Sequence, residues 1–282
     1  VNFLLFDYKG EFSDIQNNHW LSLFDVDRSC ILDPLTQPLP FTPFKDFTGR
    51  SINEINLYST EMSSALCSID RVSASANMNN RLSEAIVEAY KSTNGAPISF
   101  ELMLKCYQSR MKDANNDDSI SSVLKQLVNA HIFESEDKVS LIDDSYIIKM
   151  DGYPKDGPIA KAIVYFLMSK LNNIYELLDK QAVNDEVVQI RHFSIIDEAH
   201  YMLDFDNRPL RNLIAVGRNK GLSIILATQN MSSFKSKGFD FYANAQYPLI
   251  MKQQTIDDKV IKDLFGVSGQ ELQEIRTAIA GP

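Results

Sequence analysis

Paired acidic residues follow directly on an apolar run in the stretch FSIIDEAH, where Asp197 and Glu198 come after Ile195 and Ile196. The apolar run predicts a buried strand, and in parallel sheets the groups that do chemistry gather where strands end. At such a strand end an aspartate can hold a hydrated Mg²⁺ and a neighbouring glutamate can polarise an attacking water. An acidic first turn of a helix, favoured by the helix dipole, is the structural alternative, and the pair alone leaves both open.

A second polar strand end lies about 30 residues further on, in LSIILATQN, where Gln229 follows another apolar run. Its amide can orient a water or reach a terminal phosphate, or it can simply cap the next turn. Because the two motifs follow successive strands, we expect them at the same edge of one sheet.

The segment 208–237 carries six positive charges and no acidic residue, in a chain whose net charge is −9. The basic residues are Arg208, Arg211, Arg218, Lys220, Lys235 and Lys237. They favour either an arginine finger onto a neighbour's nucleotide or contacts to a phosphate backbone, with a solvated basic face as the alternative. The negative net charge argues against nucleic acid covering the whole surface and leaves a local basic channel open.

Asp7 to Glu11, DYKGE, is a weaker motif, because a strand-end aspartate before Lys9 and a glycine is common turn chemistry. The phosphate-binding pattern GxxxxGK[ST] does not occur among the eleven glycines of the sequence. Without a loop of that kind an ATPase binds its nucleotide poorly.

The elements that must position these residues alternate between strand and helix outside a central helical segment, which predicts an α/β fold with a mainly parallel sheet. We expect one apolar stripe on the helix that begins at Pro158, a further strand in QYPLIMKQ, and C-terminal helices that begin after Thr255 and Ser268. No run of about 18 apolar residues is present, so no membrane span is expected. Three widely spaced cysteines are typical of reduced thiols in an intracellular protein.

Taken together, DYKGEF, SIIDEAH, GRNKG and ILATQN occur in the order in which the HerA/FtsK branch of the P-loop NTPases carries its motifs. The following IMKQQTIDDKVIKDLFG also resembles the next strand and helix of that family. The resemblance covers most of residues 1–15 and 145–282. It implies a RecA-like P-loop NTPase core at 1–45 and 144–282, interrupted by a helical insertion at 46–143.

By this resemblance the chain is an ATP-hydrolysing motor that uses Mg²⁺ and moves double-stranded DNA, working as a homo-oligomeric ring, a hexamer in that family. The resemblance makes Asp197 the Walker B residue that holds Mg²⁺, Glu198 the catalytic base and Gln229 the sensor. Arg218 becomes the arginine finger that acts across a subunit boundary, with Arg211 in reserve. The remaining residues that it assigns to cofactor binding are Asp7, Lys9 and Glu11.

The departure from the family is the missing Walker A loop. Since the chain begins where the second strand of that family begins, we expect a truncation just downstream of the loop. The DYKGEF and IDEAH segments also resemble the HerA-like ATPases of phosphorothioation-dependent DNA restriction. That likeness implies a cytoplasmic protein in a defence complex with a possible nuclease partner.

Two other interpretations stay open. IDEAH with a following AT is also found in DEAH-box helicases, although such helicases usually carry S-A-T there and a second motor domain with an arginine-rich motif. A nucleotide-free scaffold within a larger complex is favoured by the missing phosphate loop. Hydrolysis of ATP by the full-length chain distinguishes a motor from a scaffold.

Overall fold

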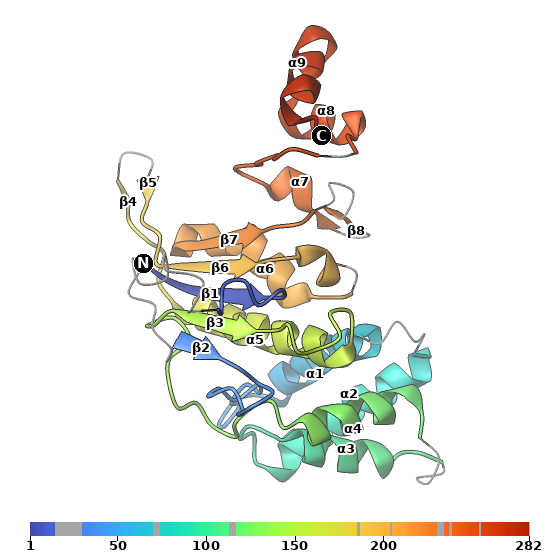
Figure 1. Ribbon diagram of the computed structural model, residues 1–282. Coiled ribbons are helices and arrows are strands. Elements are labelled where there is room, and N and C mark those ends of the chain that lie inside the picture. Colours follow the sequence, from blue (N-terminus) through green and yellow to red (C-terminus); the bar gives the residue numbers. More distant parts are fainter. Residues whose placement is uncertain are drawn as a thin grey trace.

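The computed structural model describes residues 1–14, 30–69, 74–112, 117–184, 187–203, 205–229, 234–236, 239–253 and 255–281. In this part of the chain the central feature is a five-stranded sheet with the order β2-β3-β1-β6-β7 (Figure 1). Its strands are β1 (Asn2–Asp7), β2 (Ile31–Leu32), β3 (Tyr146–Lys149), β6 (His192–Ile196) and β7 (Leu222–Leu226). Every pairing is parallel, so all five strands end at the same edge of the sheet.

The central helical segment is formed by α1 (Ile52–Ile69), α2 (Ala76–Ser92), α3 (Phe100–Gln108) and α4 (Ser119–Ala130). These helices lie within the predicted insertion at 46–143, and its exact boundaries stay a prediction. After β3, the chain forms α5 (Pro158–Leu177), the small hairpin of β4 (Val183–Asn184) and β5 (Val187–Val188), and then β6. Between β6 and β7 lie the short helix η3 (Ala199–Tyr201), α6 (Arg208–Val216) and η4 (Gly217–Lys220).

The C-terminal part contains a second hairpin, β8 (Lys235–Ser236) with β9 (Phe239–Asp240), followed by α7 (Phe241–Asn244). Beyond it, α8 (Asp258–Phe265) and α9 (Gly269–Ile279) lie apart from the sheet in Figure 1. These two helices pack on their own small cluster of Ile261, Leu272 and Ile279.

The central strands are apolar on both faces because both faces are covered. In β1, Leu4 and Phe6 join the large core shared with the helices, whereas Leu5 pairs with Ile147 in a smaller cluster on the other face. Alternate side chains of a strand point to opposite faces, so burial on both sides requires a continuous apolar run. The run at the start of the sequence predicted this strand correctly.

Helix α5 is more deeply buried than its sequence predicts. One apolar stripe is expected, but every side chain from Ala160 to Ser169 is buried. The reason is its position, since α5 contacts α6 and also α1 and α4 of the helical segment. A helix covered by neighbours on several sides is apolar around most of its circumference.

The strand predicted in QYPLIMKQ is wrong. Within the described part of the chain no strand pairs with residues 247–252, and Tyr247, Leu249 and Met251 are 88%, 89% and 78% exposed. Pro248 has no N–H to donate to a ladder, which disfavours pairing in mid-segment. The only ladder contact described here is an isolated bridge of Gln253 to Ala280.

The predicted starts of the two C-terminal helices are only partly correct. The N-cap of α8 is Asp257, whose carboxylate accepts from the amides of Lys259 and Val260, and not Thr255. Ser268 precedes α9 as expected, but its side chain makes no capping hydrogen bond. Among the described residues, none of the helices combines the length and the apolar character needed to cross a bilayer.

Candidate functional site

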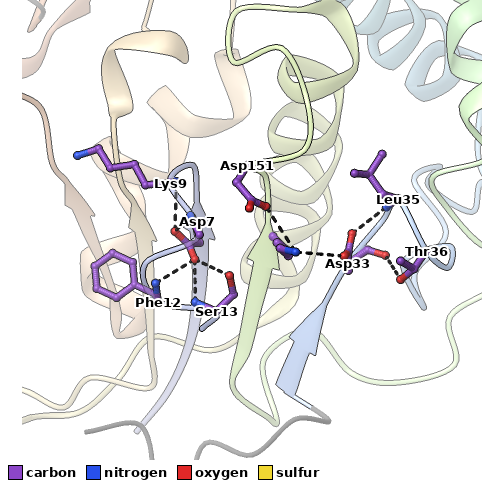
Figure 2. Close-up of polar contacts among 10 residues, drawn as sticks. Asp7, Lys9, Phe12, Ser13, Asp33, Leu35, Thr36 and Asp151 are labelled. Atoms are coloured by element: carbon purple, nitrogen blue, oxygen red, sulfur yellow. Dashed lines mark hydrogen bonds and ion pairs between the residues drawn. The ribbon is translucent and has the colours of Figure 1, made fainter. Parts of the chain in front are cut away.

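The loop after β1 is organised by the carboxylate of Asp7, which is fully buried. Its Oδ1 accepts from the amides of Lys9 and Gly10 at 3.3 and 2.9 Å. Its Oδ2 accepts from the amides of Phe12 and Ser13 and from the Ser13 hydroxyl at 2.8–3.0 Å (Figure 2). Asp7 therefore holds the DYKGEFS loop in one shape. Its role in cofactor binding stays a prediction, because all five of these bonds serve the loop.

Gly10 is required where this loop passes the end of β3. Its φ is +75°, and a Cβ placed there would lie 2.8 Å from Oδ2 of Asp151. Glycine alone adopts that backbone region without strain. Beside it, Lys149 Nζ lies 3.6 Å from Asp33 Oδ2 and 3.9 Å from Asp151 Oδ1. The side chains of Asp33 and Asp151 are labelled in Figure 2. The loop after β1 therefore packs against a polar cluster formed by Asp33, Lys149 and Asp151 at the ends of β2 and β3.

Glu198 occupies a strained turn at the end of β6. Its backbone is left-handed, with φ 51° and ψ 43°, and the residue is 4% exposed. A non-glycine residue in this region costs free energy of order 1–3 kcal/mol and persists where its surroundings enforce it. The enforcement comes from β7, because the Ala199 amide donates to the Ala227 carbonyl at 2.7 Å and the Ala227 amide donates to Ile196 at 3.0 Å.

Three strand ends converge on the carboxylate of Glu198. Oε1 lies 2.6 Å from Lys9 Nζ, and it also accepts from Gln229 Nε2 at 2.7 Å. Oε2 lies 3.3 Å from His200 Nδ1, and within the described residues it is enclosed and makes no hydrogen bond. The same His200 nitrogen lies 3.4 Å from the Thr228 hydroxyl. Residues that are far apart in sequence therefore form one polar group around a buried carboxylate.

The charges of this site interact with one another. The hydrogen bond to Glu198 raises the pKa of Lys9, and the nearby carboxylates of Glu198, Asp197 and Glu11 raise it further, while partial burial opposes them. Burial raises the pKa of Asp197, with smaller contributions from Glu198 and Asp7, whereas Lys9 lowers it. Lys9 is thus the counter-ion of an acidic cluster.

The basic residues near α6 do not converge in the same way. Arg208 pairs with Glu61 of α1 at 2.8 Å, and Arg211 pairs with Asp206. Lys220 Nζ donates to the carbonyls of Tyr175 and Glu176 at the end of α5. The side chain of Lys235 and all of Lys237 lie outside what the structure describes.

Arg218 is exposed and lies in η4, four residues before β7 begins. Its guanidinium faces the amide of Gln246, whose oxygen, once turned toward the arginine, accepts from Nε at 2.9 Å. The five residues of β7 separate Arg218 from Gln229 by roughly 16 Å along the strand. Arg218 therefore lies at the amino edge of the sheet, opposite the edge that carries Glu198.

The acidic residues suit a magnesium ion that a nucleotide brings with it. Among the described residues, no three His, Cys, Asp or Glu side chains are grouped so that they could chelate a metal by themselves. Mg²⁺ in nucleotide sites keeps several waters and takes one or two carboxylates in addition to phosphate oxygens. Asp197, half-buried directly after β6, provides one carboxylate of this kind, whereas Oε1 of the neighbouring Glu198 is already bonded to Lys9 and Gln229.

Sequence reasoning placed Glu198, Gln229 and Lys9 correctly at strand ends but gave no reason for direct contacts among them. It missed Ser13, whose amide and hydroxyl both bind Asp7; an aspartate followed six residues later by a serine in a Gly-containing loop is the available signal. The motifs gave no site role to His200, whose ring nitrogen Nδ1 lies near Glu198 and near Thr228 at the end of the next strand.

Comparison with known proteins identifies the fold. No family model matches the chain, and no curated protein sequence matches it. Among solved structures, VirB4 of Thermoanaerobacter pseudethanolicus aligns with a TM-score of 0.66 at 16% identity, over 100% of this chain and 78% of that chain. This alignment shows the fold: the chain shares the architecture of that VirB4 structure, and the predicted α/β fold with a mainly parallel sheet is confirmed.

Two further solved structures align less well. The bacterial conjugative coupling protein TrwBΔN70, in its trigonal form with sulphate, gives a TM-score of 0.49 at 14% identity, over 99% of this chain and 60% of that chain. The plasmid coupling protein TrwB in complex with ADP and Mg²⁺ gives 0.45 at 12% identity, over 99% and 68%. TM-scores below 0.5 do not by themselves establish a shared fold.

Proposed function

We propose that the chain carries the hydrolytic half of an ATPase site, and that the protein is a motor of the HerA/FtsK type. The observation that supports this most strongly is the arrangement at Glu198. A buried carboxylate, strained at a strand end and bonded to Gln229 of the next strand, is what a water-polarising base with its sensor requires. A helix that merely begins with acidic residues needs neither the left-handed turn nor the partners.

In this proposal Glu198 accepts the proton of the attacking water and Gln229 orients both. Asp197 is the residue that would hold a Mg²⁺ ion brought with the nucleotide. When bound, ATP with Mg²⁺ supplies the phosphoanhydride bond whose cleavage releases the energy for movement. The phosphate-binding loop that such a site needs does not occur in these 282 residues, so the proposal requires residues beyond them to supply it.

The finer parts of the proposal extend the resemblance. The substrate track is double-stranded DNA and the assembly is a ring of identical subunits. The setting is a cytoplasmic DNA-processing complex or a restriction complex like that of DptH, the HerA-like ATPase of phosphorothioation-dependent restriction. Arg218 acts on the nucleotide of a neighbouring subunit, which suits an exposed arginine at the edge opposite its own Glu198. Arg211 is a weaker candidate because Asp206 already neutralises it.

A catalytically silent scaffold is the second candidate, favoured by the absence of GxxxxGK[ST] from the sequence. The two functions differ in one measurement on the full-length protein, ATP hydrolysis with Mg²⁺ in the presence and absence of linear double-stranded DNA. The motor proposal expects hydrolysis that DNA stimulates, and strand displacement of a DNA triplex as a readout of movement. Full-length protein that binds Mg-ATP without hydrolysing it would leave the scaffold as the function.

A further inference from the structure

Lys9 reaches across the site toward β6 and is not directed into the polar cluster beside it. Its backbone amide is fixed by Asp7, and its side chain runs away from Asp7 and Asp151 in Figure 2. Its ammonium lies 2.6 Å from Oε1 of Glu198, and the Lys9 side chain is 30% exposed against 5% for Glu198. The lysine therefore bridges from solvent to a buried carboxylate, on a loop whose shape is fixed.

The contact leaves Glu198 unable to act as a base in this state. Oε1 already accepts from Lys9 and Gln229, which occupies its two lone pairs. Oε2 is enclosed, 3.3 Å from His200 Nδ1. A general base needs an open lone pair within hydrogen-bond reach of the proton that it takes. Neither oxygen offers one to a water.

The charges of the same site indicate what would move the Lys9 ammonium away from Glu198. This ammonium is the positive charge among the carboxylates of Asp197, Glu198 and Glu11. A divalent cation at Asp197 would repel the ammonium, and the partly exposed Lys9 side chain has solvent to move into. Because Lys9 is partly exposed and Glu198 is not, the lysine is the partner with room to move.

We propose that Lys9 is a latch on Glu198. In the free protein its ammonium prevents the carboxylate from acting as a base, and it moves away when a magnesium nucleotide binds. This inference rests on the proposed function and deepens it. It makes Lys9 a positioning residue that acts through Glu198, and it changes the expected role of Lys9 from nucleotide ligand to gate. Hydrolysis without a correctly bound nucleotide is thereby suppressed.

The latch is tested by measuring the acylation rate of lysine amines in the full-length protein. The reagent is N-hydroxysuccinimide acetate, and peptide mass spectrometry reports the rate at each lysine. Lys91, an exposed lysine on α2, is the internal reference. We expect Lys9 to react at least fivefold more slowly than Lys91 in the free protein. Saturation with Mg²⁺ and a non-hydrolysable ATP analogue should then accelerate Lys9 at least threefold, with Lys91 unchanged.

A Lys9 acylation rate that falls on nucleotide binding would show that Lys9 binds phosphate, and this would overturn the latch. An unchanged Lys9 acylation rate would also overturn the latch, because the ammonium would not have moved. Calorimetry on the same samples reports binding itself. If no Mg-nucleotide binds, the proposed function fails. The ion pair between Lys9 and Glu198 is then tested separately, by Lys9 acylation in the nucleotide-free Glu198→Gln variant. That variant should accelerate Lys9 acylation, and an unaltered rate would refute the ion pair.

Kinetics of Lys9→Met and Lys9→Arg give the second readout. Removing the ammonium should raise the DNA-independent kcat about three- to tenfold and leave nucleotide affinity within twofold. Lys9→Arg restores the charge and should restore the low basal rate. A raised KM with a lowered kcat in Lys9→Met would instead identify a nucleotide ligand and overturn the latch.

Discussion

At the carboxyl edge of the sheet, Lys9, Glu198 and Gln229 arrive from three strand ends and share one carboxylate oxygen. At the amino edge, Lys220 is bonded to the end of α5, and His192 is buried with no hydrogen-bond partner for either ring nitrogen within the described residues. At the carboxyl edge the polar groups contact a single carboxylate oxygen. At the amino edge each polar group stands apart from the others, in packing or in capping a helix.

Topology explains the difference. In a parallel sheet the ends of neighbouring strands coincide in space, so Lys9 and Glu198 meet although about two thirds of the chain lies between them. The basic residues of α6 and η4 lie along helices, where no coincidence of strand ends brings them to one point. Arg208, Arg211 and Lys220 consequently reach three different partners. Clustering in the sequence was a poorer guide to a site than position at a strand end.

Arg218 offers the sharpest way to break this comparison, because the proposal gives it a catalytic role from the amino edge. Arg218→Ala should lower ATP turnover by about 10³-fold or more, the usual contribution of an arginine finger, with nucleotide affinity retained. Mixing this variant with Glu198→Gln subunits should recover part of the activity, since each supplies what the other lacks. Turnover that stays near wild type in Arg218→Ala would reduce the amino edge to a structural role throughout.

Gln229 tests the carboxyl edge. Its exposed side chain donates to Glu198, so Gln229→Ala should lower kcat by roughly 10²- to 10³-fold. Thermal stability should barely change. Gln189, an exposed glutamine ahead of β6 at the amino edge, is the matched control, and Gln189→Ala should leave kcat within twofold. Equal effects of the two substitutions would remove the distinction between the edges.

His192 predicts a pH dependence of stability that arises at the amino edge. Burial lowers its pKa from 6.5 to about 4, so in that window the unfolded chain binds a proton that the folded chain does not. The free energy of unfolding should therefore fall by about 3 kcal/mol as the pH drops from above 6.5 to 4, with the full contribution present above 6.5.

Urea unfolding at several pH values measures this dependence. His192→Leu should remove about 3 kcal/mol of the loss, because the titrating group is gone. His131, the exposed histidine that ends α4, is the control, and His131→Asn should keep the wild-type dependence. Identical curves for His192→Leu and wild type would contradict the assignment.

Lys220 should show the smallest effect and a purely structural one. Lys220→Met removes the bonds to the carbonyls of Tyr175 and Glu176 and should cost about 1–2 kcal/mol of unfolding free energy. ATP turnover at a temperature where the variant is folded should match wild type. Lys180→Met, at an exposed position, controls for the loss of a positive charge. A large loss of turnover in Lys220→Met would assign the basic stretch to function after all.

The sequence predicted β1 well because burial on both faces left a continuous apolar run, and it predicted β7 from a similar run although Ile225 is 44% exposed. It failed at residues 247–252, where the alternation is right for a strand but Pro248 and the lack of a neighbouring strand decide otherwise. Pairing is a property of two segments, and one segment cannot report it. The stripe on α5 was incomplete for the same reason, since the neighbours that bury its other sides lie elsewhere in the chain.

The candidate site was predicted as a set of strand ends and not as a set of contacts. Asp197, Glu198 and Gln229 follow from their positions after apolar runs. That Asp7 binds its own loop, and that Lys9 binds Glu198, depends on side-chain direction and on the turn at Gly10. Neither is visible in residue types and spacing.

The central claim is that Glu198 is the base of an ATPase, and a single-turnover measurement on the full-length chain tests it most directly. Glu198→Gln keeps the shape of the side chain and removes its ability to accept a proton. The account predicts that this variant binds Mg-ATP with an affinity close to wild type and hydrolyses it at least about 10²-fold more slowly. Hydrolysis at the wild-type rate in Glu198→Gln would contradict the account.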